Sequence, residues 1–534
     1  MADLLHEFIS EAAQRSPEAT ALIFKGESLN YDELHQQVNA FAGGLMACGI
    51  GTGERVAVYL PKQNETVFAL FGAAAAGACF VPVNPLLKPR QLAHILPHCN
   101  AKVLVTSAAR LKTIQPILRS CPDLHTIVLV DAPAAEDTRG IAQSLLTYHD
   151  FCRQDALRRS PHRRIDTDVA AILYTSGSTG NPKGVVLSHR NMVAGAKSVA
   201  GYLGNTSQDR LLAVLPLSFD AGLSQLTTAF SVSASAVLMD YLLPRDVIRA
   251  VEKYGVTGLT AVPPLWNQLK DLEWSQEARS SMRYIANTGG AMPVATTHRL
   301  QEALPNTLVY LMYGLTEAFR STYLPPDQVA KRPESIGKAI PNAEILVIND
   351  LGEECGPNEP GELVHRGALV SLGYWNDPEK TAERFKPCPG RPREIISEEM
   401  AVWSGDQVTR DEEGYLYFIS RKDEMIKTSG YRVSPTEVEE VAFASDFATG
   451  AAALGIAHPT LGQAILLLVT PAAGHALGPE LEAAILNHCR AEMPNFMVPA
   501  KVVARKTLPH NQNGKIDRRA LSGEYQNLFQ EASE

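Results

Sequence analysis

Short apolar runs separated by helix-like stretches dominate the first two thirds of the chain. The runs occupy residues 56–60, 101–106, 126–130, 170–174, 211–215 and 257–262. Apolar runs of this length are typical of strands buried on both faces, and the helical segments between them are typical of parallel sheets covered by helices. The sequence therefore predicts an α/β fold built around such sheets.

The pattern changes twice in the last third of the chain. From about residue 336, strand-like runs at 343–348, 361–366 and 414–419 are separated by Gly, Pro and Asp turns, which indicates a meander or a small barrel. A helix at 434–444, a strand at 464–469 and a helix at 480–492 then follow, which is an α+β pattern. We place a domain boundary near 421–423.

The expected fold is thus a large N-terminal domain, 1–422, joined to a smaller α+β domain, 423–534. The large domain should hold two helix-covered, mostly parallel sheets and a small β-barrel-like part at about 336–422. A chain of 534 residues is too long for one ordinary core, which agrees with two domains.

Composition excludes several classes of protein. The net charge is -9, whereas a nucleic-acid-binding protein usually carries a basic face, so no nucleic-acid partner is expected. The eight cysteines form neither a CxxC pair nor a metal-ligand spacing, which favours reduced thiols in a cytoplasmic protein.

No membrane span is predicted either. The N-terminus, MADLLHEFISEAAQRSPEA, has the pattern of an amphipathic helix with acidic residues and lacks the features of a signal peptide. The apolar run at 67–83 is shorter than the roughly 20 residues that cross a bilayer, and Pro82 interrupts it. A buried helix that leads into a strand explains this run better.

The strongest single motif is TSGSTGNPKG at residues 175–184, directly after the apolar run AAILY. Its glycines allow the backbone to approach an anion closely, and its hydroxyls and backbone N–H groups are suitable donors to phosphate oxygens. Lys183 supplies a positive charge for the β- and γ-phosphates. A Walker A loop requires Gly-Lys-Ser/Thr and a dinucleotide loop requires GxGxxG, and neither is present here.

This motif resembles the signature of the acyl-adenylate-forming superfamily, which contains acyl-CoA synthetases, adenylation domains of peptide synthetases, and luciferases. The other motifs of the superfamily appear in their expected order, and the resemblance extends from about residue 4 to residue 521. The resemblance implies that ATP is bound with Mg²⁺ and that Lys183 takes part in catalysis. The phosphates would lie on Thr175, Ser176, Gly177, Ser178, Thr179 and Gly180.

Two further motifs imply the nucleotide site. In NTGGA at 287–291, the backbone of Gly289, Gly290 and Ala291 would form one wall of the adenine pocket. In YGLTE at 313–317, Tyr313 would stack on adenine beside Gly314, catalytic Thr316 would bond the α-phosphate, and Glu317 would ligate Mg²⁺, which prefers oxygen ligands.

The later motifs imply the ribose contacts and a mobile C-terminal domain. WSGD at 403–406 resembles the TGD-type motif with Ser404 in place of Thr, and Asp406 would accept hydrogen bonds from the ribose with help from Arg421. Asp423 would be the hinge, and Gly430 would belong to a loop that opens a tunnel for pantetheine.

Lys515 is the expected catalytic lysine of the mobile domain. It stands in NGKID at 513–517, which matches the NGKxD/R motif of the superfamily. Its ammonium group would bridge the substrate carboxylate and the α-phosphate as charge redistributes in the transition state, and would orient two anions that otherwise repel each other.

The acid pocket is ambiguous. By analogy it is lined by Phe219, Asp220, Thr288, Met312 and Arg320, together with Trp266 and Ser321. Many acyl-CoA synthetases carry His at the position of Phe219, whereas Phe-Asp is similar to amino-acid-activating domains, in which the Asp pairs with the substrate ammonium group. Asp220 is therefore either such an anchor or a helix N-cap. Arg320 pairs either with a second carboxylate or with Asp220, and it disfavours a long saturated fatty acid.

The resemblance implies an AMP-forming acid–thiol ligase that adenylates a carboxylic acid and forms a thioester with CoA. The sequence as a whole is also similar to acyl-CoA ligases associated with bacterial exosortase gene clusters and to stand-alone ligases that load amino acids onto carrier proteins. A phosphopantetheinyl carrier protein is thus the alternative acceptor, with an amino acid as substrate. A luciferase-like oxygenase is a remote third interpretation.

Overall fold

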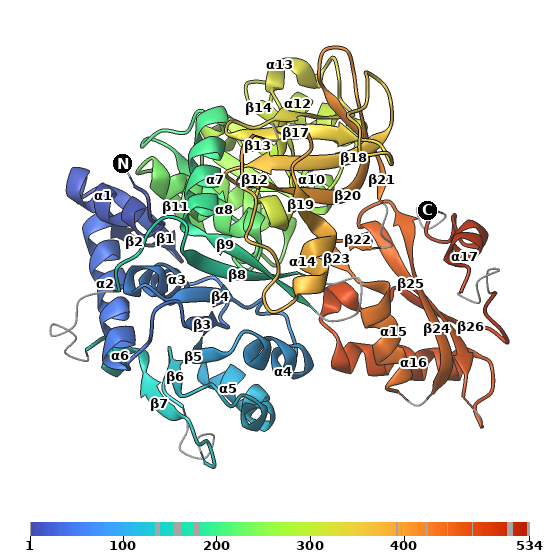
Figure 1. The fold of residues 1–534 in the computed structure, drawn as a ribbon, viewed down its shortest axis with the longest axis horizontal. Coiled ribbons are helices and arrows are strands. Elements are labelled where there is room, and N and C mark those ends of the chain that lie inside the picture. Colours follow the sequence, from blue (N-terminus) through green and yellow to red (C-terminus); the bar gives the residue numbers. More distant parts are fainter. Residues whose placement is uncertain are drawn as a thin grey trace.

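The structure is a computed structural model that places three sheets in two domains (Figure 1). It describes residues 2–133, 139–153, 162–175, 182–390, 394–396, 398–421, 425–445, 447–472, 474–509 and 516–530. The α/β class with a smaller C-terminal domain is as the sequence predicts. Residues 422–424 lie outside the described residues, so the domain boundary stays a prediction.

The first sheet has seven strands and is parallel apart from its last strand. In spatial order its strands are β7 (Ser144–Thr147), β6 (Thr126–Leu129), β5 (Ala101–Thr106), β3 (Arg55–Val58), β4 (Cys79–Pro82), β8 (Val169–Thr175) and β9 (Lys183–Ser188). β9 is antiparallel to β8 because the two strands are joined directly, whereas a parallel neighbour requires a crossover connection.

The second sheet has fourteen strands, and their pairing changes from mostly parallel to antiparallel along the sheet. Its parallel part runs through β1 (Thr20–Phe24), β11 (Ser235–Leu238), β10 (Arg210–Ala213), β12 (Gly258–Ala261), β13 (Tyr284–Asn287) and β14 (Leu308–Tyr313), with β2 (Glu27–Asn30) antiparallel at the edge beside β1. The antiparallel part continues through β15 (Thr322–Leu324), β16 (Ser335–Ala339), β21 (Leu416–Arg421), β20 (Met400–Arg410), β18 (Gly361–Gly367) and β17 (Ala343–Ile348), and β19 (Phe385–Pro387) pairs with β20. The β-rich part is therefore continuous with the parallel sheet through β15 and β16.

Helices lie between and around these two sheets. The N-terminal domain contains α1 (Glu7–Arg15), α2 (Tyr31–Ala47), α3 (Asn64–Ala76), α4 (Pro89–His98), α5 (Ala108–Ile114), α6 (Tyr148–Cys152), α7 (His189–Tyr202), α8 (Asp220–Ser231), α9 (Pro244–Tyr254), α10 (Pro263–Leu269), α11 (Gln276–Ser281), α12 (Val294–Ala303), α13 (Pro326–Val329) and α14 (Pro378–Arg384). Short 3₁₀ helices span Gln115–Ser120 and Thr316–Ala318.

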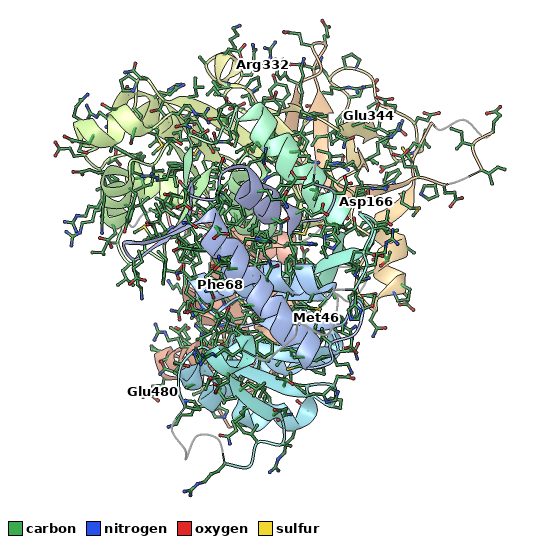
Figure 2. All side chains as sticks on the ribbon, turned by 90° about the vertical axis from the view of Figure 1, so that its left-hand side faces the viewer. Met46, Phe68, Asp166, Arg332, Glu344 and Glu480 are labelled. Carbon is green, nitrogen blue, oxygen red and sulfur yellow. The ribbon has the colours of Figure 1, made fainter. Side chains whose placement is uncertain are left out.

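Four of these helices, α2, α3, α7 and α8, share one hydrophobic core with strands from both sheets. Met46 of α2 and Phe68 of α3 mark two of them in Figure 2. The run at 67–83 forms most of α3 and all of β4, with Gly77 in the left-handed conformation between them, as the sequence predicts. Among the described residues, no helix is long and apolar enough to cross a membrane.

The C-terminal domain is a five-stranded sheet with helices. The strands are β23 (Tyr431–Val433), β22 (Ile426–Thr428), β25 (Gly462–Pro471), β24 (Ala448–His458) and β26 (Lys501–Ala504). The helices are α15 (Pro435–Phe443), α16 (Pro479–Glu492), the 3₁₀ helix Asn495–Met497 and α17 (Arg518–Glu524). Figure 1 shows β23 close to the N-terminal domain and α17 on the opposite side of the small domain.

One glycine fixes how α8 begins. A Cβ on Gly222 would lie 1.9 Å from the carbonyl oxygen of Pro216, in the segment that leads into the helix. This clash would be with backbone atoms, and no flexible side chain could move aside to relieve it. The segment can therefore follow its path only if residue 222 has no Cβ. The start of α8 therefore depends on glycine at this position.

We expect Gly222→Ala to lower the melting temperature clearly, because overpacking of this kind costs about 1–3 kcal/mol or more. Gly201→Ala, in α7, is the matched control, because a Cβ there meets no atom within 4 Å and Ala favours helix by about 1 kcal/mol. Thermal denaturation of both variants checks this. Equal melting temperatures for Gly222→Ala and the wild type would contradict the packing described for α8.

Candidate active site

The TSGSTGNPKG motif connects two antiparallel strands. Thr175, the last residue of β8, faces Lys183, the first residue of β9. Ser176, Gly177, Ser178, Thr179 and Gly180 lie outside the described residues. The motif thus begins and ends at adjacent points of the sheet, so that Lys183 stands at the base of the loop.

The side chains of Tyr313 and Asp406 meet across the second sheet. Tyr313 ends β14, and its hydroxyl donates a hydrogen bond to Oδ2 of Asp406 in β20. The hydroxyl of Ser404 accepts a bond from the Asp406 backbone N–H at 3.1 Å and donates to the Leu363 carbonyl at 2.7 Å. Ser404 therefore anchors the backbone beside Asp406. Two residues assigned to adenine and ribose from separate motifs lie in direct contact.

Arg421 occupies a register position beside Asp406. The backbones of the two residues are partners in the β20–β21 pairing. The Arg421 side chain lies outside the described part of the chain. Its predicted role at the ribose therefore rests on its backbone position and its motif.

A tight turn follows β13. Gly289 has a φ of +77°, which favours glycine, and the side-chain amide of Asn287 donates to the Gly290 carbonyl at 2.8 Å. Gly289 and Ala291 are exposed, whereas Thr288 is buried beneath them. The turn therefore presents bare backbone to its surroundings, as a wall against a flat aromatic ring requires.

Asp220, Thr316 and Arg320 form one polar cluster. Asp220 Oδ2 lies 3.1 Å from Nη1 of Arg320, and Asp220 Oδ1 accepts a bond from the Thr316 hydroxyl at 3.2 Å. The side chains of Arg320 and Asp220 are 3% and 14% exposed, so the ion pair is largely desolvated. Of the two partners left open for Arg320 by the sequence, the structure shows Asp220.

The N-cap interpretation of Asp220 was wrong. Phe219 is the N-cap of α8, and Asp220 is the first residue of the helix proper. The reason is that Asp220 turns its carboxylate toward Thr316 and Arg320 instead of toward the free N–H groups of its own helix. The sequence offered Arg320 as a possible partner of Asp220 but did not indicate Thr316.

A cavity adjoins this cluster. It is narrow, with a volume of about 10 Å³, which is room for about one water molecule. Its walls mix apolar and polar groups: Val199, Leu203, Leu211, Ala221, Ser224, Gln225, Thr228, Gly258, Thr260, Tyr284, Met312 and Arg320. Sequence reasoning found Met312 and Arg320 but missed the α8 residues, although the spacing 221, 224, 225, 228 places them on one face of a helix.

Two residues assigned to the acid pocket, Thr288 and Phe219, are not among the residues that line this cavity. Thr288 belongs to the turn after β13, and its backbone N–H donates to the Ala261 carbonyl at 3.0 Å. Phe219 makes an edge-to-face contact with Tyr431 of the C-terminal domain, with ring centroids 5.3 Å apart. Phe219 therefore lies where the two domains meet.

Glu317 stands among cationic groups. The Tyr374 hydroxyl donates to its Oε1 at 2.7 Å, and Lys183 Nζ lies 5.0 Å from the centre of the Tyr374 ring. Burial opposes ionisation of Glu317, but Arg432, the Tyr374 hydroxyl and Arg384 together hold its pKa below the ordinary value. Burial likewise lowers the pKa of Lys183, which Glu317 partly offsets. The sequence did not reveal Tyr374, because no motif contains it.

An ionised Glu317 close to Lys183, at the base of the predicted phosphate loop, fits Mg²⁺. In the part of the chain that the structure describes, no cluster of three or more His, Cys, Asp or Glu side chains is suited to a metal ion. Mg²⁺ is commonly held by one or two carboxylates with water and substrate phosphates, so a single carboxylate here fits an ion that arrives with the nucleotide.

The C-terminal domain places a hairpin against this region. Ser429 and Gly430, with φ of +52° and +82°, form the turn between β22 and β23. A Cβ on Gly430 would lie 3.0 Å from the Val262 side chain, and a Cβ on Gly289 would lie 3.1 Å from the same valine. The hairpin tip and the glycine turn after β13 therefore share one neighbour.

Aromatic and charged contacts hold the hairpin in place. Tyr431 stacks on Phe496 with ring centroids 3.8 Å apart, and burial raises its pKa to about 12. Arg90 of α4 and Glu440 of α15 form an ion pair at 3.7 Å between the domains.

Asp423 and Lys515 lie outside the described residues. α17, which begins three residues after Lys515, lies away from the N-terminal domain (Figure 1).

Comparison with known proteins gives the family. The model of the AMP-binding enzyme family matches residues 9–375, and that of the AMP-binding enzyme C-terminal domain matches residues 437–515. A long-chain-fatty-acid–CoA ligase of Salmonella typhimurium is 30% identical, over 97% of this chain and 94% of the ligase. Tyrocidine synthase 2 of Brevibacillus parabrevis is 31% identical over 97% of this chain, which spans 13% of that protein.

Solved structures show the same fold. The amide bond synthetase of Marinactinospora thermotolerans superimposes with a TM-score of 0.84 at 22% identity, covering 98% of this chain and 99% of the synthetase. The o-succinylbenzoate CoA synthetase of Bacillus subtilis gives 0.82 at 24% identity, covering 97% and 98%.

The chain belongs to the AMP-binding enzyme family. Its reaction class is that of the AMP-forming acid–thiol ligases, as the sequence predicts. The roles of the individual side chains remain predictions.

One buried carboxylate gives a prediction about pH. Glu437, in α15, is buried, and its Oε2 has no hydrogen-bond partner among the described residues. Burial, and then repulsion by Glu440, raises its pKa from 4.5 to about 8 despite Arg90 nearby. The unfolded chain therefore loses this proton at lower pH than the folded protein, so stability falls as pH rises from 4.5 toward 8.

Glu437→Gln should remove that loss. At about pH 9 we expect the variant to be more stable than the wild type by about 1–3 kcal/mol, and at about pH 4 the two should converge. Thermal melts across this range measure it. Glu480→Gln, on the exposed start of α16 (Figure 2), is the control and should follow the wild type. A variant that melts like the wild type at every pH would contradict the burial of an unpaired carboxyl.

Proposed function

We propose that this enzyme adenylates a small carboxylic acid with ATP and then forms a thioester with CoA. The observation that carries the proposal is a chain of contacts among four features: the base of the TSGSTGNPKG loop, the glycine turn after β13, the Tyr313–Asp406 pair and the C-terminal hairpin. Lys183 lies near Tyr374, which bonds Glu317; Arg432 of the hairpin is close enough to lower the pKa of Glu317; and Gly430 and Gly289 share Val262 as a neighbour. The first three suit the phosphates, purine and ribose of a nucleotide. The fourth suits delivery of a second substrate.

In the first step, the acid's carboxylate attacks the α-phosphorus and pyrophosphate leaves. Lys183 stabilises the phosphates and Lys515 neutralises the reacting oxygens. Thr316 donates to the α-phosphate once its hydroxyl turns away from Asp220, which accepts its single O–H in the described orientation. Glu317 would hold Mg²⁺, which supplies positive charge to the nucleotide phosphates. Asp406 accepts from the ribose hydroxyls while Tyr313 fixes its orientation. The protein positions and neutralises, and no protein nucleophile is required.

In the second step, a thiolate attacks the acyl-adenylate and AMP leaves. The described orientation suits this step, because the β22–β23 hairpin approaches Val262 and Phe219 while α17 lies on the far side of the small domain. Arg432, close enough to Glu317 to lower its pKa, adds positive charge near the place that pyrophosphate vacates. Lys515 is delivered by the other orientation, so the two steps alternate.

Loading of an amino acid onto a carrier protein is the second candidate. The similarity to tyrocidine synthase 2 and the Phe219-Asp220 pair favour it. The structure adds a condition, because Asp220 already pairs with Arg320. An ammonium group would have to displace or share this partner.

ATP–pyrophosphate exchange over a panel of amino acids and of short and aromatic acids tests the first step. We expect at least one acid to support exchange that depends on Mg²⁺. CoA and a phosphopantetheinylated carrier protein, offered separately with that acid, then identify the acceptor. If no acid releases AMP and pyrophosphate from ATP, the proposal is wrong.

Lys515→Ala should separate the two steps. We expect the variant to lose about 100-fold or more in adenylate formation while largely retaining thioester formation from a supplied acyl-adenylate. Lys506→Ala, in the same domain outside the motif, is the control and should keep both activities. Equal loss in both half-reactions would contradict the role assigned to Lys515.

A further inference from the structure

We infer that the acid substrate carries an uncharged oxygen, a hydroxyl or a carbonyl, on the part of the molecule remote from the reacting carboxylate, and that Arg320 recognises it. This inference rests on the proposed function, because it assigns the cavity beside Asp220 to the acid. It goes further by naming a substrate class and the residue that selects it.

The first step of the inference concerns the donors of Arg320. Nη1 is engaged by Asp220 at 3.1 Å and by the Phe319 carbonyl at 3.4 Å. Nε is buried and has no acceptor among the described residues. A buried donor on a charged group is costly to leave unpaired. Because Arg320 lines the cavity, a ligand oxygen in that cavity is the natural acceptor.

The second step concerns charge. The cavity wall already holds one carboxylate, Asp220, and one guanidinium, Arg320, in a mostly buried pair. A second carboxylate on the substrate would leave this desolvated site with an unbalanced negative charge, and an ammonium group would leave it with a positive one. A neutral acceptor leaves the ion pair intact.

The third step concerns the remaining polar walls. The Thr228 hydroxyl is buried and has no hydrogen-bond partner within the described ranges, and Ser224 stands on the same face of α8. The amide of Gln225, in contrast, is used by the backbone: its Nε2 donates to the carbonyls of Leu212 and Thr260. The groups left for a ligand are thus hydroxyls and one guanidinium N–H, which suit a neutral oxygen better than a saturated chain.

Matched acid pairs test the inference by ATP–pyrophosphate exchange: 3-hydroxybutanoate against butanoate, 4-hydroxybenzoate against benzoate, and serine against alanine. We expect the oxygenated acid of at least one pair to have a kcat/KM higher by about tenfold or more, because a site built for a hydrogen bond rejects the analogue that lacks it. If every oxygen-free acid is used as well as its partner, the inference is wrong while the proposed adenylation stands. If no acid is used, the proposed function itself fails.

Arg320→Lys separates recognition from charge balance. Lysine keeps a cation for Asp220, but its donors are all on one nitrogen, so it lacks the separate Nε donor of the guanidinium group. We expect the variant to melt close to the wild type, and we expect its kcat/KM for the oxygenated acid to fall by about tenfold more than its kcat/KM for the oxygen-free acid, so that the preference between the two acids is lost. An unchanged preference in Arg320→Lys would overturn the assignment to Arg320.

The double variant Asp220→Asn with Arg320→Met tests whether a lost preference for the oxygenated acid could instead result from misfolding. The double change removes both charges together, so no buried charge is left without a partner. We expect a folded protein in which the preference for the oxygenated acid has disappeared. A folded double variant that keeps the wild-type preference would also overturn the inference.

Discussion

The docking of the β22–β23 hairpin on the N-terminal domain is the contact on which the described arrangement depends. Gly430 lies so close to Val262 that a methyl group would have to displace it, and Tyr431 is inserted between Phe219 and Phe496. These contacts are apolar and tightly packed, and packing of this kind favours discrete arrangements over continuous ones. A domain that docks in this way is suited to switch between two positions.

The electrostatics of the site follow from this contact. Arg432 arrives with the hairpin and helps to keep Glu317 ionised against the effect of burial. If the hairpin leaves, Glu317 loses one cationic neighbour, and a metal ion with the nucleotide phosphates is suited to replace it. The Asp220–Arg320 pair, in contrast, lies wholly within the N-terminal domain, and Arg320 lines the cavity that we assign to the acid. In this proposal, the choice of acid and the order of the two steps are served by separate groups.

The sequence predicted local elements such as strands and missed several contacts between segments that are distant in the chain. The strands at 101–106 and 343–348 begin and end at the predicted residues, because apolar runs between turn residues depend on their own pattern. The motifs also named the residues that converge, including Tyr313 and Asp406, although only a resemblance brought them together. The Tyr374–Glu317 bond, the antiparallel β8–β9 pairing and the Thr316–Asp220 bond were not foreseen, since each depends on how segments far apart in the chain pack. The Asp220–Arg320 pair was one of two alternatives that the sequence left open.

A cross-link between the domains tests the central claim most directly. Arg90 and Glu440 meet at 3.7 Å between the domains, and their side chains are 41% and 43% exposed, so Cys at both positions can be joined by a short bismaleimide. We expect the joined enzyme to transfer an acyl group from supplied acyl-adenylate to CoA but to lose ATP–pyrophosphate exchange by about 100-fold. Each single-Cys variant, treated identically, controls for reaction at the native thiols and should keep both activities. Full exchange activity in the cross-linked enzyme would contradict the account.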